Sequence, residues 1–301
     1  MSALPAILEL RAPAKVNLVL RVVGRRPDGF HELETVMQTL ELADRLRLER
    51  RPGAGIELTT DVPWVPAGEE NLVWRGARLF LAHTGLPGGV AIHLAKRVPA
   101  GGGLGGGSSD LAALLVGMNR LWGEPLTSVE LGALAARLGS DTAFFVTGGR
   151  ALCRGRGERV ESLAGEPSFT FLLVMPPFPC PTGAVFDRLE RGDFSKEDRF
   201  RRALDGMIES GADPRDWVFN DLEDAARRAV PGLDLFWRGL DAAGLEDFRL
   251  SGSGSTLFRL FREREEALEL GRRAGSLLEG KAMVQLAEQA PGGHPFSSPE
   301  R

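Results

Sequence analysis

A cluster of glycines is the feature of this sequence that most strongly suggests chemistry. The segment 99–110 reads Pro-Ala-Gly-Gly-Gly-Leu-Gly-Gly-Gly-Ser-Ser-Asp and holds six glycines within seven residues. Each glycine loses much backbone entropy on folding, and the usual compensation is a close approach of the backbone to a ligand. The N–H groups of such a loop bind anions, together with the positive N-terminus of a following helix. We therefore predict a phosphate-binding loop, in which the hydroxyls of Ser108 and Ser109 reach phosphate oxygens or Mg²⁺.

Other interpretations of the glycine cluster fit less well. A flexible linker is disfavoured because a strand and an apolar helix are expected close on either side. The P-loop pattern requires a lysine directly after the glycines, and none is present. Gly101, Gly103 and Gly106 match the dinucleotide pattern G-x-G-x-x-G, but the segment 96–100 separates them from the preceding strand. A nicotinamide-dependent oxidoreductase therefore stays only a distant alternative.

Two charged residues elsewhere are candidates for proton transfer. Lys15 lies in the segment Pro-Ala-Lys-Val-Asn-Leu, between two expected strands and two residues before Asn17. Asp141 follows an expected helix and precedes an apolar pair. Taken alone, the lysine fits an ordinary surface charge and the aspartate an ordinary helix N-cap. Lysine is scarce, with four among 37 basic residues, so a lysine that is retained is a candidate for a role that needs a compact charge.

Two short segments are candidates for substrate recognition. The segment 28–33 (Asp-Gly-Phe-His-Glu-Leu) combines a turn with the aromatic ring of Phe30 and the imidazole of His31, which can form hydrogen bonds. A hairpin with a packed phenylalanine would also explain it. The segment 251–256 (Ser-Gly-Ser-Gly-Ser-Thr) is a second loop of small residues, which a tight turn between two strands would equally explain.

Short strands and helices are expected to position these residues. In the first half, hydrophobic patterning predicts strands at 7–11, 16–23, 36–40, 46–49, 56–60 and 90–94. Helices are predicted at 71–85, with Asn71 and Gly85 as caps, at 111–122, and from a capping box of Thr127 and Glu130 to 138. A domain boundary is expected near 150–165. The apolar run 169–175 fits a buried strand, and the second half is expected to hold helices near 183–190, 197–209, 220–229, 233–243 and 262–276 and a last strand near 282–286.

Composition and charge exclude several classes of protein. The 301 residues are 43% hydrophobic and 26% charged, as in globular proteins, which argues against disorder and against a coiled coil. No apolar run approaches the roughly 18–20 residues that span a bilayer, and no signal peptide is expected. A net charge of −4 offers no electrostatic case for binding nucleic acid or an anionic membrane. Two cysteines form no disulfide framework, and four scattered histidines lack zinc-ligand spacing, so a reducing cytoplasm is expected.

The order of the chemistry-bearing segments resembles that of the GHMP kinase superfamily, named for galactose, homoserine, mevalonate and phosphomevalonate kinases. Its first motif is similar to 13–18, its second, P-x-x-x-G-L-G-G/S-S-S, to 99–109, and its third to 250–256. Segment 26–33 is similar to the R-x-D-G-Y-H-x-L of those members that act on a cytidine diphosphate ester of methylerythritol. Segments 139–145, 181–186 and 220–223 also resemble motifs of these members. Phe30 replaces their usual Tyr, and Thr142–Ala143 replace Val-Pro.

The resemblance implies a fold and an activity. The fold would be α+β, in two domains: a ribosomal-protein-like N-terminal GHMP kinase domain, 1–155, with the phosphate loop, and a ferredoxin-like C-terminal GHMP kinase domain, 156–288, followed by a disordered tail, 289–301. The activity would be ATP-dependent phosphorylation of the 2-hydroxyl of the methylerythritol moiety, in the non-mevalonate route to isoprenoid precursors. A GHMP kinase with a mevalonate- or homoserine-like substrate is the nearest alternative, and a non-catalytic RNA-binding protein is the most remote.

The resemblance also assigns roles to residues. Asp141 would accept the proton of the substrate hydroxyl, and Lys15 would keep that carboxylate ionised. Asn17 would orient the substrate, Phe30 and Phe186 would sandwich cytosine, and His31 would hydrogen-bond its edge. Mg²⁺ would bind near Ser108, and the partners would be small molecules only, bound to a monomer or weak homodimer. ATP would be held by Lys96, Pro99, Ala100, Gly101, Gly102, Gly103, Leu104, Gly105, Gly106, Gly107, Ser108 and Ser109.

Overall fold

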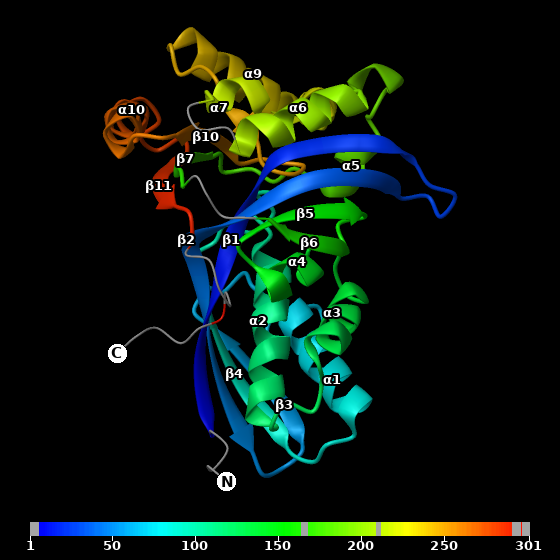
Figure 1. Ribbon diagram of the computed structural model, residues 1–301. Coiled ribbons are helices and arrows are strands. Elements are labelled where there is room, and N and C mark those ends of the chain that lie inside the picture. Colours follow the sequence, from blue (N-terminus) through cyan, green and yellow to red (C-terminus); the bar gives the residue numbers. More distant parts are fainter. Residues whose placement is uncertain (1–5, 164–167, 209–211, 291–295, 297–301) are drawn as a thin grey trace.

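Two long antiparallel strands, β1 (Ile7–Arg25) and β2 (His31–Arg51), organise the first half of the chain in the computed structural model, which describes residues 6–163, 168–208, 212–290 and 296. They run side by side along the molecule and bend together in its upper part (Figure 1). The sequence predicted four short strands here. The prediction of breaks was wrong because β-bulges let a strand bend without ending, and the register of β1 shifts between Pro13 and Lys15 and again between Asn17 and Val19. Lys15 therefore lies within a strand and not between two.

In the described part of the chain the first sheet has seven strands, because the two halves of β2 pair with different partners. The C-terminal half of β2, residues 45–51, pairs with β4 (Gly89–Ala95), which also pairs with β3 (Gly55–Thr60). The N-terminal half of β2, residues 33–38, pairs with β5 (Arg150–Gly155), and β5 forms a hairpin with β6 (Arg159–Leu163). The short strand β8 (Phe219–Asn220) adds to β1 in parallel. Strand β6 thus stays in this sheet although it lies beyond residue 155, the expected domain boundary.

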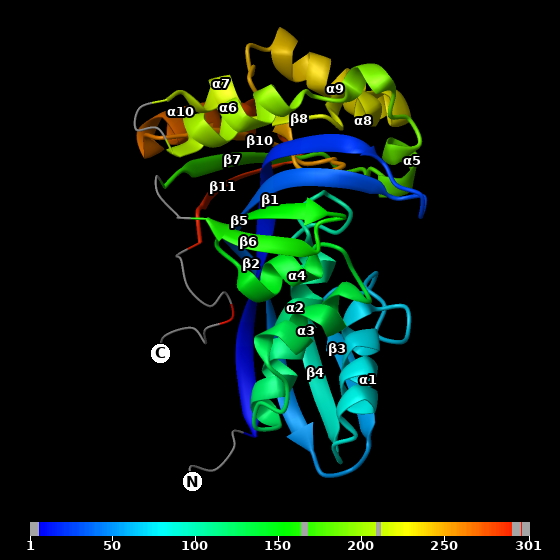
Figure 2. The ribbon, with the colours of Figure 1, turned by 45° about the vertical axis from the view of Figure 1, so that its right-hand side comes forward.

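Helices α1 (Leu72–Thr84) and α2 (Gly106–Leu121) cover one face of the lower part of this sheet (Figures 1 and 2). Helix α4 (Thr142–Thr147) lies beside β6, and α3 (Ser128–Ala136) packs on the other helices. The predicted caps of α1 are confirmed, with the Asn71 side chain accepting from Val73 N and Gly85 left-handed. The predicted capping box of α3 is also confirmed. Helix α2 begins at Gly106 and not near 111, because the last glycines of the cluster form its first turn.

The second sheet has the strand order β11-β7-β10-β9. Its buried centre, β7 (Thr170–Met175), lies between β11 (Met283–Glu288) and β10 (Leu257–Phe261), and β9 (Arg249–Leu250) completes it. The helices expected in this half are present, and α6, α7 and α9 gather at the end of the molecule away from α1 (Figure 2). The expected helices are α5 (Thr182–Phe186), which ends before the predicted residue 190, α6 (Glu197–Ile208), α8 (Glu223–Ala229), α9 (Pro231–Ala242) and α10 (Arg264–Leu277). The short helix α7 (Pro214–Trp217) was not predicted from the sequence.

The two sheets share a hydrophobic core, which holds the site in place. In one cluster, Val16 and Val36 from the first sheet pack with Phe171 and Phe258 from the second. The strand that carries Lys15 is therefore buried between both sheets. The α+β class expected from the sequence is confirmed. In the part of the chain that the structure describes, no helix is both long and apolar enough to cross a membrane.

Part of the expected disordered tail is packed on the fold. Gln289 bridges to Leu40, and Ala290 N donates to Thr39 O at 3.0 Å. The Phe296 side chain is fully buried in the core beside α2, and Arg120 donates to its carbonyl. The prediction of disorder was wrong at these residues. Burial of the Phe296 ring offsets the entropy lost when this part of the chain is ordered. The remainder of 291–301 lies outside the described residues.

Candidate active site

A large pocket, of about 1390 Å³, brings the predicted site residues together. Every residue assigned from the sequence lines this pocket except Ser109, which is fully buried on α2. The walls come from segments that are far apart in the sequence. They include β1, β2, the turn between these two strands, the segment 64–72, the glycine loop, the turn before α4, the turn between β5 and β6, the region around α5, and the second loop of small residues.

The ammonium of Lys15 lies at the centre of a group of oxygen atoms. Its Nζ donates to Asn17 Oδ1 at 2.6 Å and to Gly103 O at 2.9 Å, and it lies 3.5 Å from Asp141 Oδ2. The Lys15 side chain is only 4% exposed, whereas that of Asp141 is 30% exposed and open to the pocket. Asp141 holds the N-cap position of α4 without making a side-chain capping bond. Its carboxylate therefore faces a buried cation, and the interpretation as an ordinary N-cap does not apply.

A buried threonine fixes the orientation of Asn17. The amide Nδ2 of Asn17 donates to Thr35 Oγ1 at 2.9 Å, and the Thr35 hydroxyl donates to Val19 O at 2.7 Å. An amide that donates to Thr35 must turn its oxygen toward Lys15. Thr35 on β2 thus sets which atom of Asn17 the ammonium meets. The sequence analysis missed Thr35, because only the pairing of β1 with β2 brings it opposite Leu20 and next to Asn17.

The glycine loop leads into α2 with free N–H groups facing the pocket. The first N–H groups of a helix have no partner within the helix, and none of Gly106, Gly107 or Ser108 donates a backbone bond elsewhere among the described residues. All three residues line the pocket. Helix α2 is 16 residues long, so its dipole adds positive potential at this end. The loop therefore fits a phosphate group.

Several of the glycines are required by packing within the protein. A Cβ at Gly103 would clash with Ser251 O, and one at Gly105 would lie 2.8 Å from Phe145 Cζ. The loop is also tied to its neighbours, since Leu104 O accepts from Lys15 N at 2.9 Å and Gly102 O accepts from Thr256 N at 3.1 Å. Its shape is thus held before any ligand binds.

The second loop of small residues closes over Lys15. Gly252 has a left-handed backbone (φ +56°), and a Cβ there would lie 3.2 Å from Lys15 Nζ, so glycine suits this close approach of the loop. Asn220 holds the loop from behind, because its Nδ2 donates to Leu250 O at 2.8 Å and to Gly252 O at 2.7 Å. The segment is therefore part of the site and more than a tight turn between two strands.

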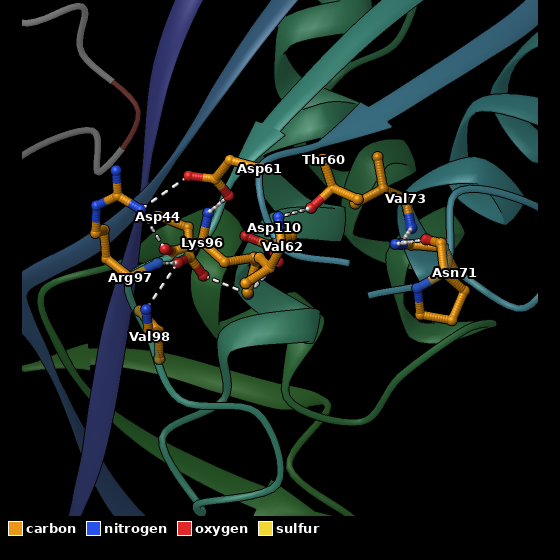
Figure 3. A network of polar contacts seen from close by, with 11 residues as sticks. Asp44, Thr60, Asp61, Val62, Asn71, Val73, Lys96, Arg97, Val98 and Asp110 are labelled. Atoms are coloured by element: carbon orange, nitrogen blue, oxygen red, sulfur yellow. Dashed lines mark hydrogen bonds and ion pairs between the residues drawn. The ribbon is translucent and has the colours of Figure 1, made fainter. Parts of the chain in front are cut away.

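Lys96 lies between two buried carboxylates (Figure 3). Its Nζ pairs with Asp110 Oδ2 at 2.7 Å and with Asp44, whose other oxygen accepts from the backbone N–H groups of Arg97 and Val98. Burial raises the pKa of Asp110 to about 8, against the opposing effect of Lys96. The ammonium was expected to neutralise phosphate or adenine. Here it ties α2 to β2 at the edge of the pocket, and the expected role stays a prediction.

The aromatic residues form two separate contacts. His31 and Phe186 stack with ring centroids 5.0 Å apart and an interplanar angle of 26°. Phe30 is 52% exposed, and the guanidinium of Arg156 covers its ring at 4.8 Å. Burial, with a smaller effect of Arg25, lowers the pKa of His31, so the imidazole is neutral at pH 7. The predicted sandwich of cytosine between Phe30 and Phe186 stays a prediction, since His31 now lies against Phe186.

The oxygen donors of the pocket fit a magnesium ion that is held mainly by phosphate and water. No group of three or more His, Cys, Asp or Glu within the described ranges is placed to hold a metal by itself. Mg²⁺ typically takes only one or two protein ligands and completes its shell with phosphate oxygens and waters. Ser108 lines the pocket at the start of α2, and its hydroxyl supplies a suitable donor.

Comparison with known proteins gives the class first. Residues 71–149 match the family described as GHMP kinases N terminal domain. This match and the fold are those of a GHMP kinase, an ATP-dependent enzyme that acts on small molecules. A homoserine kinase from Cytophaga hutchinsonii shares this fold, with a TM-score of 0.76 at 19% identity over 99% of this chain and 98% of its own.

Closer relatives give the particular family. A 4-diphosphocytidyl-2-C-methyl-D-erythritol kinase of Pelotomaculum thermopropionicum is 39% identical, over 89% of this chain and 93% of its own. The enzyme of that name from Ralstonia nicotianae is 40% identical, over 95% and 96%. A crystal structure of 4-(cytidine 5'-diphospho)-2C-methyl-D-erythritol kinase is 37% identical with a TM-score of 0.77, over 95% of this chain and 100% of its own. The chain belongs to the 4-diphosphocytidyl-2-C-methyl-D-erythritol kinase family.

Proposed function

We propose that this chain transfers the γ-phosphoryl group of ATP to the 2-hydroxyl of 4-diphosphocytidyl-2-C-methyl-D-erythritol. The observation that carries the proposal is the buried Lys15 ammonium, 3.5 Å from Asp141, at the wall of a pocket that also holds the phosphate loop and the Phe30–His31 pair. A proton acceptor, an anion cradle and a base-recognition pair are the three parts that such a transfer requires.

Asp141 is the proposed general base. Its carboxylate takes the proton of the substrate hydroxyl as that oxygen bonds to the γ-phosphorus and the bond from phosphorus to the β-phosphate oxygen breaks. The neighbouring ammonium of Lys15 offsets negative charge on the attacking oxygen. Asn17 and Gly103 O keep the ammonium in place. Because phosphoryl transfer has a loose transition state, most of the catalysis would come from positioning and charge.

The phosphate loop and Ser108 are the proposed binding site for the nucleotide and its metal ion. The N–H groups of 106–108 would bind phosphate oxygens, and the Ser108 hydroxyl would supply the protein donor for Mg²⁺. When bound, Mg²⁺ neutralises charge on the phosphate oxygens. Pro99, Ala100, Gly101 and Lys96 would form the rest of this wall.

Base recognition separates this proposal from other members of the superfamily. A mevalonate- or homoserine-like substrate has no nucleobase. Such a substrate would therefore not need the exposed ring of Phe30 or the neutral imidazole of His31. The proposal includes a place in the non-mevalonate route to isoprenoid precursors, a cytoplasmic location and a monomer or weak homodimer. It also includes a division into domains 1–155 and 156–288. In the β5–β6 hairpin, β5 belongs to the first of these domains and β6 to the second.

A coupled assay of ADP release tests the proposed substrate. The protein is mixed with ATP and Mg²⁺ and with one acceptor at a time: the cytidyl ester, its uridine analogue, mevalonate or homoserine. We expect the cytidyl ester to give the highest kcat/KM. A higher value for mevalonate or homoserine would contradict the substrate and leave the kinase chemistry standing. An ADP signal from none of them would contradict the proposed activity.

A further inference from the structure

Arg156 is a cation that the mechanism above does not use, and it lies between the two ends of the site. It forms the turn between β5 and β6, where the next residue, Gly157, packs on the turn before α4. A Cβ at Gly157 would lie 3.5 Å from Asp141 Oδ1 and from Ser140 O. From there the side chain reaches Phe30, with its guanidinium carbon 4.8 Å from the ring centroid. Arg156 thus spans the distance from the proposed base to the proposed cytosine site.

The positive charge of Arg156 has no carboxylate partner in the described part of the chain. Its neighbours on the same hairpin differ, because Arg154 pairs with Glu34 and Glu161, and Arg159 pairs with Glu32. The Glu158 carboxylate accepts from the backbone N–H of Arg156 and forms no ion pair with its guanidinium among the described residues. The pKa of Asp28 is lowered mainly by its hydrogen bond with Arg26 and least by Arg156. A half-buried guanidinium at the wall of a pocket, with no anion of its own, is suited to an anionic ligand.

We propose that Arg156 binds the diphosphate group of the nucleoside diphosphate ester. The inference rests on the proposed function, which places the base of the substrate at Phe30 and its reacting alcohol at Asp141. The diphosphate joins these two parts, so it must lie between them, where Arg156 lies. The planar fork of a guanidinium binds two phosphate oxygens at once, and stacking on Phe30 limits the rotamers that the side chain loses on binding.

The role predicts a particular pattern in the kinetics. The diphosphate does not change during transfer to the distant hydroxyl, so its contact with Arg156 is equally strong before and during the reaction. Loss of such a contact raises KM and leaves kcat nearly unchanged. A hydrogen bond to a charged group corresponds to about a 10- to 100-fold change in affinity. We therefore expect Arg156→Gln to raise KM for the cytidyl ester by about this factor, with KM for ATP unchanged.

Calorimetric titration with cytidine diphosphate and with cytidine tests the proposal directly. Saturating ADP is present throughout, so that the phosphate loop is filled. In the wild type, cytidine diphosphate should bind about 10- to 100-fold more tightly than cytidine, and Arg156→Gln should remove most of this difference. The control variant is Arg154→Gln, which removes an arginine on the same hairpin that is already paired and should keep the difference. Arg156→Lys keeps the charge without the fork and should retain part of it.

Each outcome of this titration decides between distinct claims. If the wild type prefers cytidine diphosphate and Arg156→Gln keeps the full preference, Arg156 does not bind the diphosphate, although the proposed substrate stands. If the wild type binds neither ligand, the proposed cytidine site fails, and the role of Arg156 fails with it. A thermal melt of each variant shows whether it is folded, and equal loss of both ligands in a folded Arg156→Gln would also overturn the proposal.

Discussion

Replacement of Gly107 by alanine should move stability and ATP affinity in opposite directions. Gly107 is the second residue of α2, it is exposed to the pocket, and a Cβ there would meet only Leu72 Cδ1, at an ordinary 3.6 Å. Since the protein has room for the methyl group, the fold should not suffer. Gly105 could not serve for this test, because its Cβ would lie 2.8 Å from Phe145 and damage the fold as well.

The magnitudes follow from helix propensity and from the proposed phosphate contact. Alanine within a helix is favoured over glycine by roughly 0.5–1 kcal/mol. For a chain of 301 residues this raises Tm by about 1–2 °C, from an unfolding entropy of ~2.1 cal/mol/K per residue. A methyl group on the surface of the phosphate cradle should weaken at least one hydrogen bond to a charged oxygen. That loss raises KM for ATP by about 10- to 100-fold.

The assay pairs thermal melts with steady-state kinetics at varied ATP. The control is Gly132→Ala on α3, where a Cβ would meet nothing within 4 Å and which is not among the residues that line the site pocket. It should give a similar gain in Tm with no change in KM for ATP. An unchanged KM in a stable Gly107→Ala would show that no phosphate approaches the first turn of α2, and would refute the proposed cradle.

Three further perturbations test other parts of the site. Thr35→Val should lower kcat about tenfold, because the Asn17 amide loses the bond that orients it, and Thr35→Ser should restore the rate; equal rates for both variants would contradict this. The raised pKa of Asp110 means that the folded protein holds a proton that the unfolded chain releases between about pH 4 and 8, so stability should fall as pH rises through this window. Asp110→Asn should flatten that fall in a series of melts, and an equal slope would argue against a protonated Asp110. His31→Ala should reduce the preference for cytidine over uridine while Phe30→Ala weakens both, and an unchanged preference in His31→Ala would remove that histidine from base recognition.

Local signals in the sequence were sufficient for the glycine loop and for several helix ends. Asn71 and Gly85 cap α1, and Thr127 with Glu130 form the predicted box, because each of these features needs only residues a few positions apart. The resemblance of the motifs to those of GHMP kinases identified most of the other residues that line the pocket as site residues. The site as a set was therefore predictable before the fold was known, although the roles of its members stay predictions.

Features that depend on long-range packing were not predictable in the same way. The breaks expected within β1 and β2 are absent because bulges keep the strands paired. The sequence analysis missed the β5–β6 hairpin and Arg156 in its turn. The turn lies next to Asp141 only in the folded chain, so its residues carry no local signal of a role in the site. Lys96 was expected to face a ligand, and its two carboxylate partners come from positions 14 and 52 residues away. Such contacts exist only in the folded chain.

The most direct test of the central claim is the rate of Asp141→Asn at saturating ATP and acceptor. The amide keeps the shape of the side chain but cannot take a proton, and the pair with Lys15 loses its negative partner. Loss of a general base lowers kcat by about 10²- to 10⁴-fold. We expect a fall of this size, with little change in the KM of either substrate and with a wild-type Tm. A kcat close to that of the wild type would contradict the account, because the proton would then be accepted by another group.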